Sequence, residues 1–398
     1  MEKKKIKIGL VPRLIIGIIL GVIVGSFCPE WFCRLIVTLS SIFSSYLKFV
    51  IPLMILSFVT MGIADLTQGA GKLLGITALI AYGSTLIGGS MGYGVAVSLF
   101  PGFMNPADLQ KIADTADKSL AAYFSISITP IMDTISAVVL AFILGLCLSV
   151  TGAKSKNSVI YNGMNEFSGF IGKVLNMTII PLLPLYICGT FTDMTYSGKT
   201  FVILGILWKV FLVVIILHWI YMILQFTVAG SVTKKNPFSL LRKQLPGYTT
   251  ALGTQSSAAT IPVNLICAEN EGVSQEIRNF VVPLCANIHM CGSMITITCC
   301  SVAVLLMNGL PVSFTTVFPF MCTLGIAMVA SPGAPGGSIM TALPFLPMVG
   351  LGTEALQALM IALYITQDSF GTACNVSGDN AIGLIVDKIN DRFIKKAV

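Results

Sequence analysis

The stretch YITQDSFGTACNVSGDNAIGLIV, residues 364–386, places two carboxylates in an otherwise apolar segment. On a helix, with about 100° and 1.5 Å per residue, Asp368, Thr372, Asn375 and Asp379 fall on one narrow polar stripe, because they are four, three and four residues apart. The two carboxylates would lie about 16 Å apart along it. Ionisable groups in a membrane helix are costly and by default mark an ion or substrate path. The stripe therefore predicts such a path.

The structural alternative is a pair of carboxylates that are neutralised by packing partners. Few basic residues lie inside apolar sequence, and Lys48 and Lys209 are the candidates. Both side chains are long enough to reach the membrane surface instead. We therefore favour the functional interpretation.

The composition agrees with a membrane protein. Of 398 residues, 55% are hydrophobic and only 10% are charged, with a mean hydropathy of +0.89. Soluble domains carry about 25% charged residues. The net charge of +7 lies in basic clusters between apolar runs, which is typical of the cytoplasmic loops of a polytopic protein and does not indicate a nucleic-acid partner.

Apolar runs of about 20 residues predict spanning helices. Eight such spans are expected, over residues 10–27, 35–63, 73–100, 126–150, 165–190, 201–231, 279–307 and 355–388.

Two further apolar segments are interrupted at their middles by small and polar residues. They are 237–267, broken by TQSSAATIPVN, and 314–350, broken by SPGAPGGS. Broken backbone at membrane depth is tolerated only where it is buried in protein or lines a cavity. A matched pair of interrupted segments indicates the binding site of a transporter. We expect both to be re-entrant helical hairpins.

The basic clusters orient the chain in a cell membrane with both termini in the cytoplasm. The two hairpins then enter from opposite sides, which gives an inverted repeat. Counting each hairpin as a full span also keeps both termini inside, so charge alone leaves that alternative open.

The polar groups suit a zwitterion. One aspartate can meet an ammonium group while the other binds a cation. Free N–H groups at half-helix N-termini, with the hydroxyls of Ser256 and Ser257, suit a carboxylate. His289 is open to two interpretations, a hydrogen-bonded core residue or a proton carrier.

Four sequence blocks, in order, resemble the dicarboxylate/amino acid:cation symporters, which have the glutamate-transporter fold. They are TQSSAATIPVN and SPGAPGGS at the two hairpin tips, NIHMCGS in the seventh helix and DSFGTACNVSGD in the eighth. Within that family the motifs are most similar to those of the bacterial serine/threonine symporters. The resemblance covers the whole chain in topology and is specific over about residues 237–390.

The resemblance implies a substrate site in which Asp368 binds the ammonium group with Thr372, and Asn375 binds the carboxylate. Gly371 stands where members with acidic substrates carry an arginine, so bidentate recognition of a second carboxylate is absent. The expected substrate is therefore a small neutral amino acid. The other implied substrate-binding residues are Ser256, Ser257, Ser293, Ala334 and Gly336.

The same resemblance implies sodium sites. One would use Asp379, Asn375, His289 and Cys285, and a second Met328, Val329, Ser331, Asn287 and Met290. A third family site looks absent, because His289 and Cys291 replace its asparagine and aspartate and a thiol is a poor ligand for a hard cation. We expect one or two sodium ions per substrate, with a proton as the alternative.

The implied mechanism is an elevator in a homotrimer. Residues 1–235 would mainly form the scaffold and trimer contacts, with spans 73–100 and 201–231 partly in the moving part. Residues 236–398 would form the transport core. An exchanger, a small-carboxylate carrier or, less favoured, an ion channel remain alternatives. No nucleophile–base or metal constellation indicates an enzyme.

Overall fold

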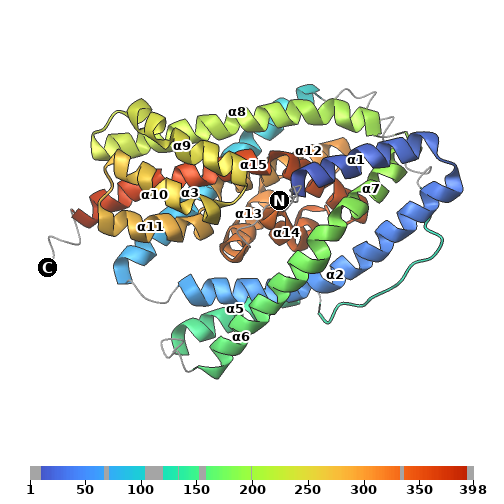
Figure 1. Ribbon diagram of the computed structural model, residues 1–398, viewed down its shortest axis with the longest axis horizontal. Coiled ribbons are helices and arrows are strands. Elements are labelled where there is room, and N and C mark those ends of the chain that lie inside the picture. The colour runs from blue at the N-terminus through green and yellow to red at the C-terminus, as the bar shows by residue number, and fades with distance from the viewer. Residues whose placement is uncertain are drawn as a thin grey trace, which may run out of the picture.

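The computed structural model describes residues 10–66, 71–103, 120–132, 134–151, 158–198, 200–331 and 336–391. Within these ranges every regular element is a helix, which confirms the all-α class. In Figure 1 the molecule is elongated, with α8 along one long edge and α2 along part of the other.

Along the described chain, the helices are α1 (Leu10–Phe27), α2 (Glu30–Leu66), α3 (Gly71–Leu99), η1 (Phe100–Phe103), α5 (Thr134–Thr151), α6 (Val159–Val174), η3 (Leu175–Ile179), α7 (Ile180–Tyr196), α8 (Thr200–Thr233), α9 (Pro237–Thr254), α10 (Ser257–Glu271), α11 (Gln275–Ile288), α12 (Cys291–Met307), α13 (Phe314–Ala327), η4 (Met328–Ala330), α14 (Gly337–Ala342), η5 (Leu343–Val349) and α15 (Glu354–Ile389).

Five stretches are long and apolar enough to cross a membrane by length and composition: Glu30–Ser57, Leu73–Phe103, Val159–Tyr196, Ile203–Thr233 and Gln275–Met307. They support a multi-pass membrane protein. The count of eight spans and the side from which each hairpin enters stay predictions.

One group of helices, α1, α2, α5, α6 and α7, packs mainly within itself. Helix α1 comes very close to α7 because glycines recur every four residues on its contact face. A Cβ atom at Gly17, Gly21 or Gly25 would lie 2.6 Å from a backbone carbonyl oxygen of α7. Small residues are what allow such close helix packing in lipid, where apolar side chains gain nothing from leaving water.

The second group consists of α3 and α8 to α15, with α12 and α15 at its centre (Figure 1). All of α12 from Cys291 to Leu305 is buried, as is most of α15. The polar side chains on these two helices therefore need partners within the protein.

Both interrupted segments fold back on themselves. Hairpin 1, which is α9 and α10, turns at Gln255 in the left-handed conformation (φ 54°), and the two helices pack together. Hairpin 2 covers residues 314–349. Its second half begins after Gly336 (φ 78°), a conformation that favours glycine. Ala334, predicted to bind substrate, lies outside the described residues.

The predicted helix over 279–307 is not continuous, which corrects that expectation. It is two helices, α11 and α12, separated by His289 and Met290 in non-helical conformations. The N–H groups freed by the break find side-chain acceptors. Met290 N donates to Thr85 Oγ1 (3.2 Å), and Gly292 N donates to Asn375 Oδ1 (2.7 Å). The break persists because these buried donors are satisfied.

Candidate functional site

The predicted polar stripe of α15 is buried along its whole length. Asp368, Thr372, Asn375 and Asp379 are 4%, 6%, 2% and 1% exposed. Buried polar groups are almost always hydrogen-bonded, so the partners of each side chain decide what the stripe can do. The partners differ sharply between the two carboxylates.

Asp368 is surrounded by neutral donors, among them the hydroxyl of Thr372 one turn further along α15. Gly336 N, at the start of α14 in hairpin 2, donates to Oδ2 at 2.7 Å, and Tyr364 Oη donates to Oδ1 at 2.8 Å. No Lys, Arg or His side chain pairs with it in the described part of the chain. The structure thus brings together Gly336 and Asp368, two of the predicted substrate-binding residues, and within the described residues it leaves the carboxylate without a cationic partner.

A chain of hydroxyl groups leads away from Asp368. Ser293 Oγ lies 3.1 Å from Tyr364 Oη and 3.3 Å from Ser338 Oγ, and Asn375 Nδ2 donates to it at 3.0 Å. Sequence reasoning found Ser293 but missed Tyr364 and Ser338. The spacing of Tyr364, one helical turn before Asp368, was the signal for the first of these.

Asn375 caps the N-terminus of α12. Its Oδ1 accepts from Gly292 N at 2.7 Å and from Ser293 N at 3.3 Å. Two backbone donors fix the orientation of the amide, because its oxygen must face them. The Nδ2 group therefore points to Ser293 and, at 3.5 Å, to Met290 Sδ.

Gly371 lies at the closest approach of α15 to α12. A Cβ atom there would be 3.4 Å from the backbone of Gly292, an ordinary contact, whereas one on Gly292 would collide with the Gly371 carbonyl. Gly371 thus faces the start of α12 beside Ser293. Thr372, the next residue of α15, is buried on the same stripe.

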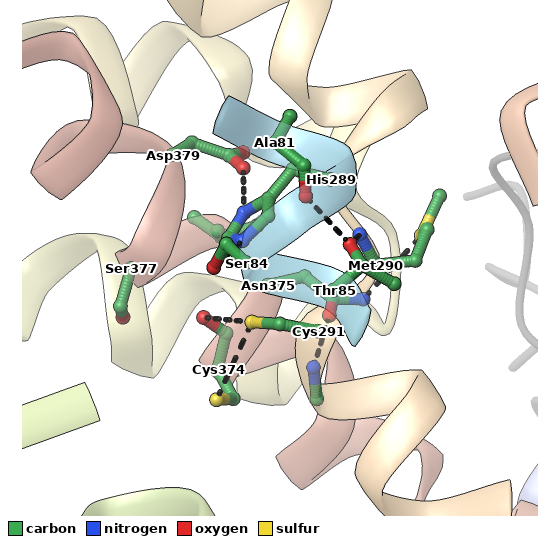
Figure 2. A network of polar contacts seen from close by, with 12 residues as sticks. Ala81, Ser84, Thr85, His289, Met290, Cys291, Cys374, Asn375, Ser377 and Asp379 are labelled. Atoms are coloured by element: carbon green, nitrogen blue, oxygen red, sulfur yellow. Dashed lines mark hydrogen bonds and ion pairs between the residues drawn. The ribbon is translucent and has the colours of Figure 1, made fainter. Parts of the chain in front are cut away.

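Asp379 has an imidazole as its partner (Figure 2). His289 Nδ1 lies 2.9 Å from Asp379 Oδ1, while Oδ2 has no hydrogen-bond partner among the described residues. The other ring nitrogen, Nε2, lies 3.0 Å from Ser84 Oγ and 3.3 Å from Gln225 Nε2. The side chain of His289 therefore occupies one oxygen of the predicted sodium ligand.

Gly378 makes this arrangement possible. A Cβ atom at that position would lie 2.6 Å from Gln225 Nε2 and would also collide with the His289 ring. Cys291, which the resemblance aligns with an aspartate, lies on the other side of the break with its Sγ 4.0 Å from that of Cys374 (Figure 2).

The second predicted ion site lies where hairpin 2 meets α11. Met328 and Val329 are in η4, which packs against α11, and the Ser331 hydroxyl is buried with no partner in the described structure. Asn287 is exposed and donates to Pro283 O of its own helix. A buried oxygen without a donor is consistent with cation binding near Ser331. The side chain of Asn287 is engaged elsewhere.

The remaining predicted residues lie at the N-terminus of α10 and in the last turn of α11. Ser256 caps α10 by accepting from Ala259 N at 3.2 Å, and Ser257 is buried in its first turn. Cys285 is buried one turn before His289, and its carbonyl accepts from His289 N at 2.9 Å.

A bundle of long apolar helices, with helical hairpins and a buried carboxylate that has no cationic partner among the described residues, is typical of a membrane transporter. Comparison with known families narrows this class. The model of the sodium:dicarboxylate symporter family matches residues 10–389, and the chain belongs to that family.

Two bacterial relatives match over nearly the whole chain, and a human relative matches over two thirds of it. A serine/threonine transporter SstT from Acinetobacter baylyi is 28% identical over 96% of this chain and 98% of its own length. An SstT from Streptococcus agalactiae serotype Ia is 24% identical over 96% of both. The neutral amino acid transporter A of Homo sapiens is 27% identical over 67% of this chain and 50% of its own length.

Proposed function

We propose that the protein imports a small neutral amino acid, of the serine/threonine type, together with sodium. The observation that carries this proposal is Asp368, a buried carboxylate whose partners are neutral: a backbone N–H, a phenol and the hydroxyl of Thr372. Neutral donors can be exchanged for a substrate ammonium, which adds a charge-assisted hydrogen bond. A carboxylate already paired with lysine or arginine would gain no such additional hydrogen bond from the substrate.

The direction of the hydroxyl chain supports a neutral substrate. With Asp368 ionised, as recognition of an ammonium requires, the single Tyr364 proton goes to Asp368, because a carboxylate only accepts. Ser338 donates to Ser293 Oγ, which also accepts from Asn375 Nδ2 and lies 3.1 Å from Tyr364 Oη. The chain ends in the lone pairs of Ser338, which can accept from a substrate hydroxyl but repel a second carboxylate.

Gly371 supports the same conclusion, since it supplies no guanidinium group for an acidic side chain. The similarity to serine/threonine transporters from two bacteria agrees with it as well.

For the coupling ion, Ser331 and the carbonyls of Met328 and Val329 are the better-supported ligands. Their hairpin carries a buried hydroxyl without a partner in the described structure. The Asp379 site is less well supported, because His289 takes up one carboxylate oxygen. We therefore propose one or two sodium ions per substrate, the number that the resemblance implies.

The proposed mechanism is an elevator within a homotrimer in the cell membrane, with both termini in the cytoplasm. The two helix groups support a division into scaffold and transport core, with α3 and α8 in the moving group. Binding of sodium and substrate would shift hairpin 2 toward a closed arrangement.

The test is uptake of labelled serine and threonine by purified protein in liposomes. We expect uptake under an inward sodium gradient, with inhibition by unlabelled neutral amino acids and not by aspartate. Uptake that needs only a proton gradient would favour the second candidate, a proton-coupled carrier, which the imidazole on Asp379 motivates. Absence of amino acid uptake or exchange under both gradients would contradict the proposal.

A further inference from the structure

A second buried polar cluster lies between hairpin 1 and α15, apart from the substrate and ion residues described above. It consists of Gln244 on α9, Asn264 and Glu271 on α10, and Asn380 on α15. Each of these side chains is at most 1% exposed. Asn264 is the last residue of the TQSSAATIPVN block, and none of the four takes part in the proposed transport chemistry.

The three amides of this cluster have fixed orientations. Asn264 Nδ2 donates to Val376 O at 3.0 Å, so Asn264 Oδ1 is left to accept from Gln244 Nε2 at 2.9 Å. Asn380 Nδ2 donates to Gln244 Oε1 at 2.7 Å and to Asn264 O at 3.1 Å. Backbone carbonyls can only accept, and they stand at both ends of the chain of amides. Rotating any one amide would place two acceptors against each other.

This fixed order leaves an excess of acceptors. Asn380 Oδ1 and both oxygens of Glu271 are buried without a hydrogen-bond partner in the described structure. Each such group carries a desolvation penalty, and an unpaired buried charge carries the largest. Three buried acceptors without a donor favour binding of a positively charged species.

The charged groups around Glu271 do not supply a donor. Lys235 Nζ, from the connection between α8 and α9, donates instead to the backbone oxygens of Glu271 (2.7 Å) and Gly272 (3.3 Å). Lys243 of α9 faces the carboxyl from an exposed position. On α11, Arg278 is paired with Glu269 at 3.0 Å.

Two further titratable groups belong to the packed helices. Cys267 lies one turn before Glu271 on α10 and interacts with it electrostatically. Asp387 of α15 accepts from Ser274 N and Oγ. The Asn380 side chain lies within hydrogen-bonding reach of the carboxyl group; its N–H would favour the ionised form and its Oδ1 the protonated form. The Glu271 carboxyl group therefore has lysine charges on its outer side and the Asn380 amide on its buried side.

We infer that Glu271 is a proton-binding site and that its protonated carboxyl group donates to Asn380 Oδ1. The proton comes from solvent, and its binding turns one of the three free acceptors into a donor for another. A metal ion would add a charge facing Lys235 and Lys243, whereas a proton leaves a neutral group that both lysines tolerate. The bound proton joins the end of hairpin 1 to α15, the helix that carries Asp368 and Asp379.

Thermal unfolding of the purified full-length protein in lipid nanodiscs, from mildly acidic to alkaline pH, tests this inference. The folded protein holds the proton and the unfolded chain releases it, so stability must fall as the pH rises. We expect wild type to lose stability as the pH becomes alkaline. In Glu271→Gln, whose amide is a permanent donor, most of this loss should be absent. Glu269→Gln, two residues away and paired with Arg278 at the surface, should behave as wild type.

Three results would overturn the inference. One is an equal alkaline loss in wild type and Glu271→Gln. Another is that sodium, but not choline, restores stability at alkaline pH in wild type and fails to do so in Glu271→Gln. That result would assign a metal ion to the site. The third concerns Asn380→Ala, which covers the case that Glu271→Gln does not fold. We expect this variant to shift the carbonyl band of the protonated carboxyl group in the infrared spectrum, and an unshifted band would contradict the assigned partner.

Discussion

The two carboxylates of the α15 stripe lie eleven residues apart and have opposite surroundings. Asp368 is bound by a backbone N–H from hairpin 2, by a phenol and by the hydroxyl of Thr372. Asp379 is bound by the imidazole of His289, at the break between α11 and α12. The first set of partners is neutral, whereas the second contains a group that can itself carry charge.

This difference separates binding of a ligand from internal pairing. A neutral N–H donor can be replaced by an ammonium group with a gain in electrostatic energy. Replacing an imidazole requires moving a ring that Gly378, Gln225 and Ser84 enclose. Identical residue types in one helix thus have different roles because their neighbours differ.

Asp368→Asn should have the largest effect. Loss of the charge that meets the substrate ammonium should weaken serine binding by about 3 kcal/mol or more, roughly a hundredfold. Binding to purified protein measures this, and elution as an intact assembly on size exclusion controls for folding. Unchanged affinity would refute the ammonium role.

Gly378→Ala should disrupt the other carboxylate. The added methyl group would overlap Gln225 and His289, with an expected loss of about 1–3 kcal/mol in stability. Gly383→Ala is the matched control on the same helix, because a Cβ there meets its nearest atoms at 3.8 Å. The two variants are compared by thermal unfolding. Equal stability would show that His289 is not held in this close packing.

Ser338→Ala should change selectivity with little effect on stability. It removes the acceptor at the end of the hydroxyl chain, which is worth about 1 kcal/mol, so the preference for serine over alanine should fall roughly fivefold. The ratio of kcat/KM for the two substrates measures this. Ser377→Ala, which removes a hydroxyl bonded only within α15, should keep the wild-type ratio. An unchanged ratio in Ser338→Ala would remove Ser338 from the pocket.

Glu354→Gln should have the smallest effect. Glu354, at the start of α15, pairs with Lys48 of α2 at 2.6 Å, but both side chains are more than 40% exposed. Exposed pairs contribute about 0.5 kcal/mol and are screened by salt. A double-mutant cycle with Lys48→Met measures the coupling energy. A coupling energy well above about 1 kcal/mol would mean that this pair is a strong link between the two helix groups.

The sequence predicted much of this arrangement because the relevant signals are local. The spacing of Asp368, Thr372, Asn375 and Asp379 placed them on one stripe, and α15 keeps that stripe buried. The interruptions by small and polar residues marked both chain reversals. Such patterns depend on helical periodicity and on backbone chemistry, which are readable within a few residues.

Contacts between distant segments were not predictable in the same way. The break at His289 depends on Thr85 and Asn375, which are far away in sequence and accept its free N–H groups. The pairing of His289 with Asp379 joins residues 90 positions apart. Ser338 reaches Ser293 only through the packing of hairpin 2. No local pattern encodes these distances.

The contrast between Asp368 and Asp379 is tested most directly by a cryo-EM structure of the protein with serine and sodium. We predict that the serine ammonium lies within hydrogen-bonding distance of Asp368 in place of Gly336 N, and that His289 remains on Asp379. A sodium ion coordinated by Asp379 with His289 displaced, or a serine ammonium bound away from Asp368, would contradict it.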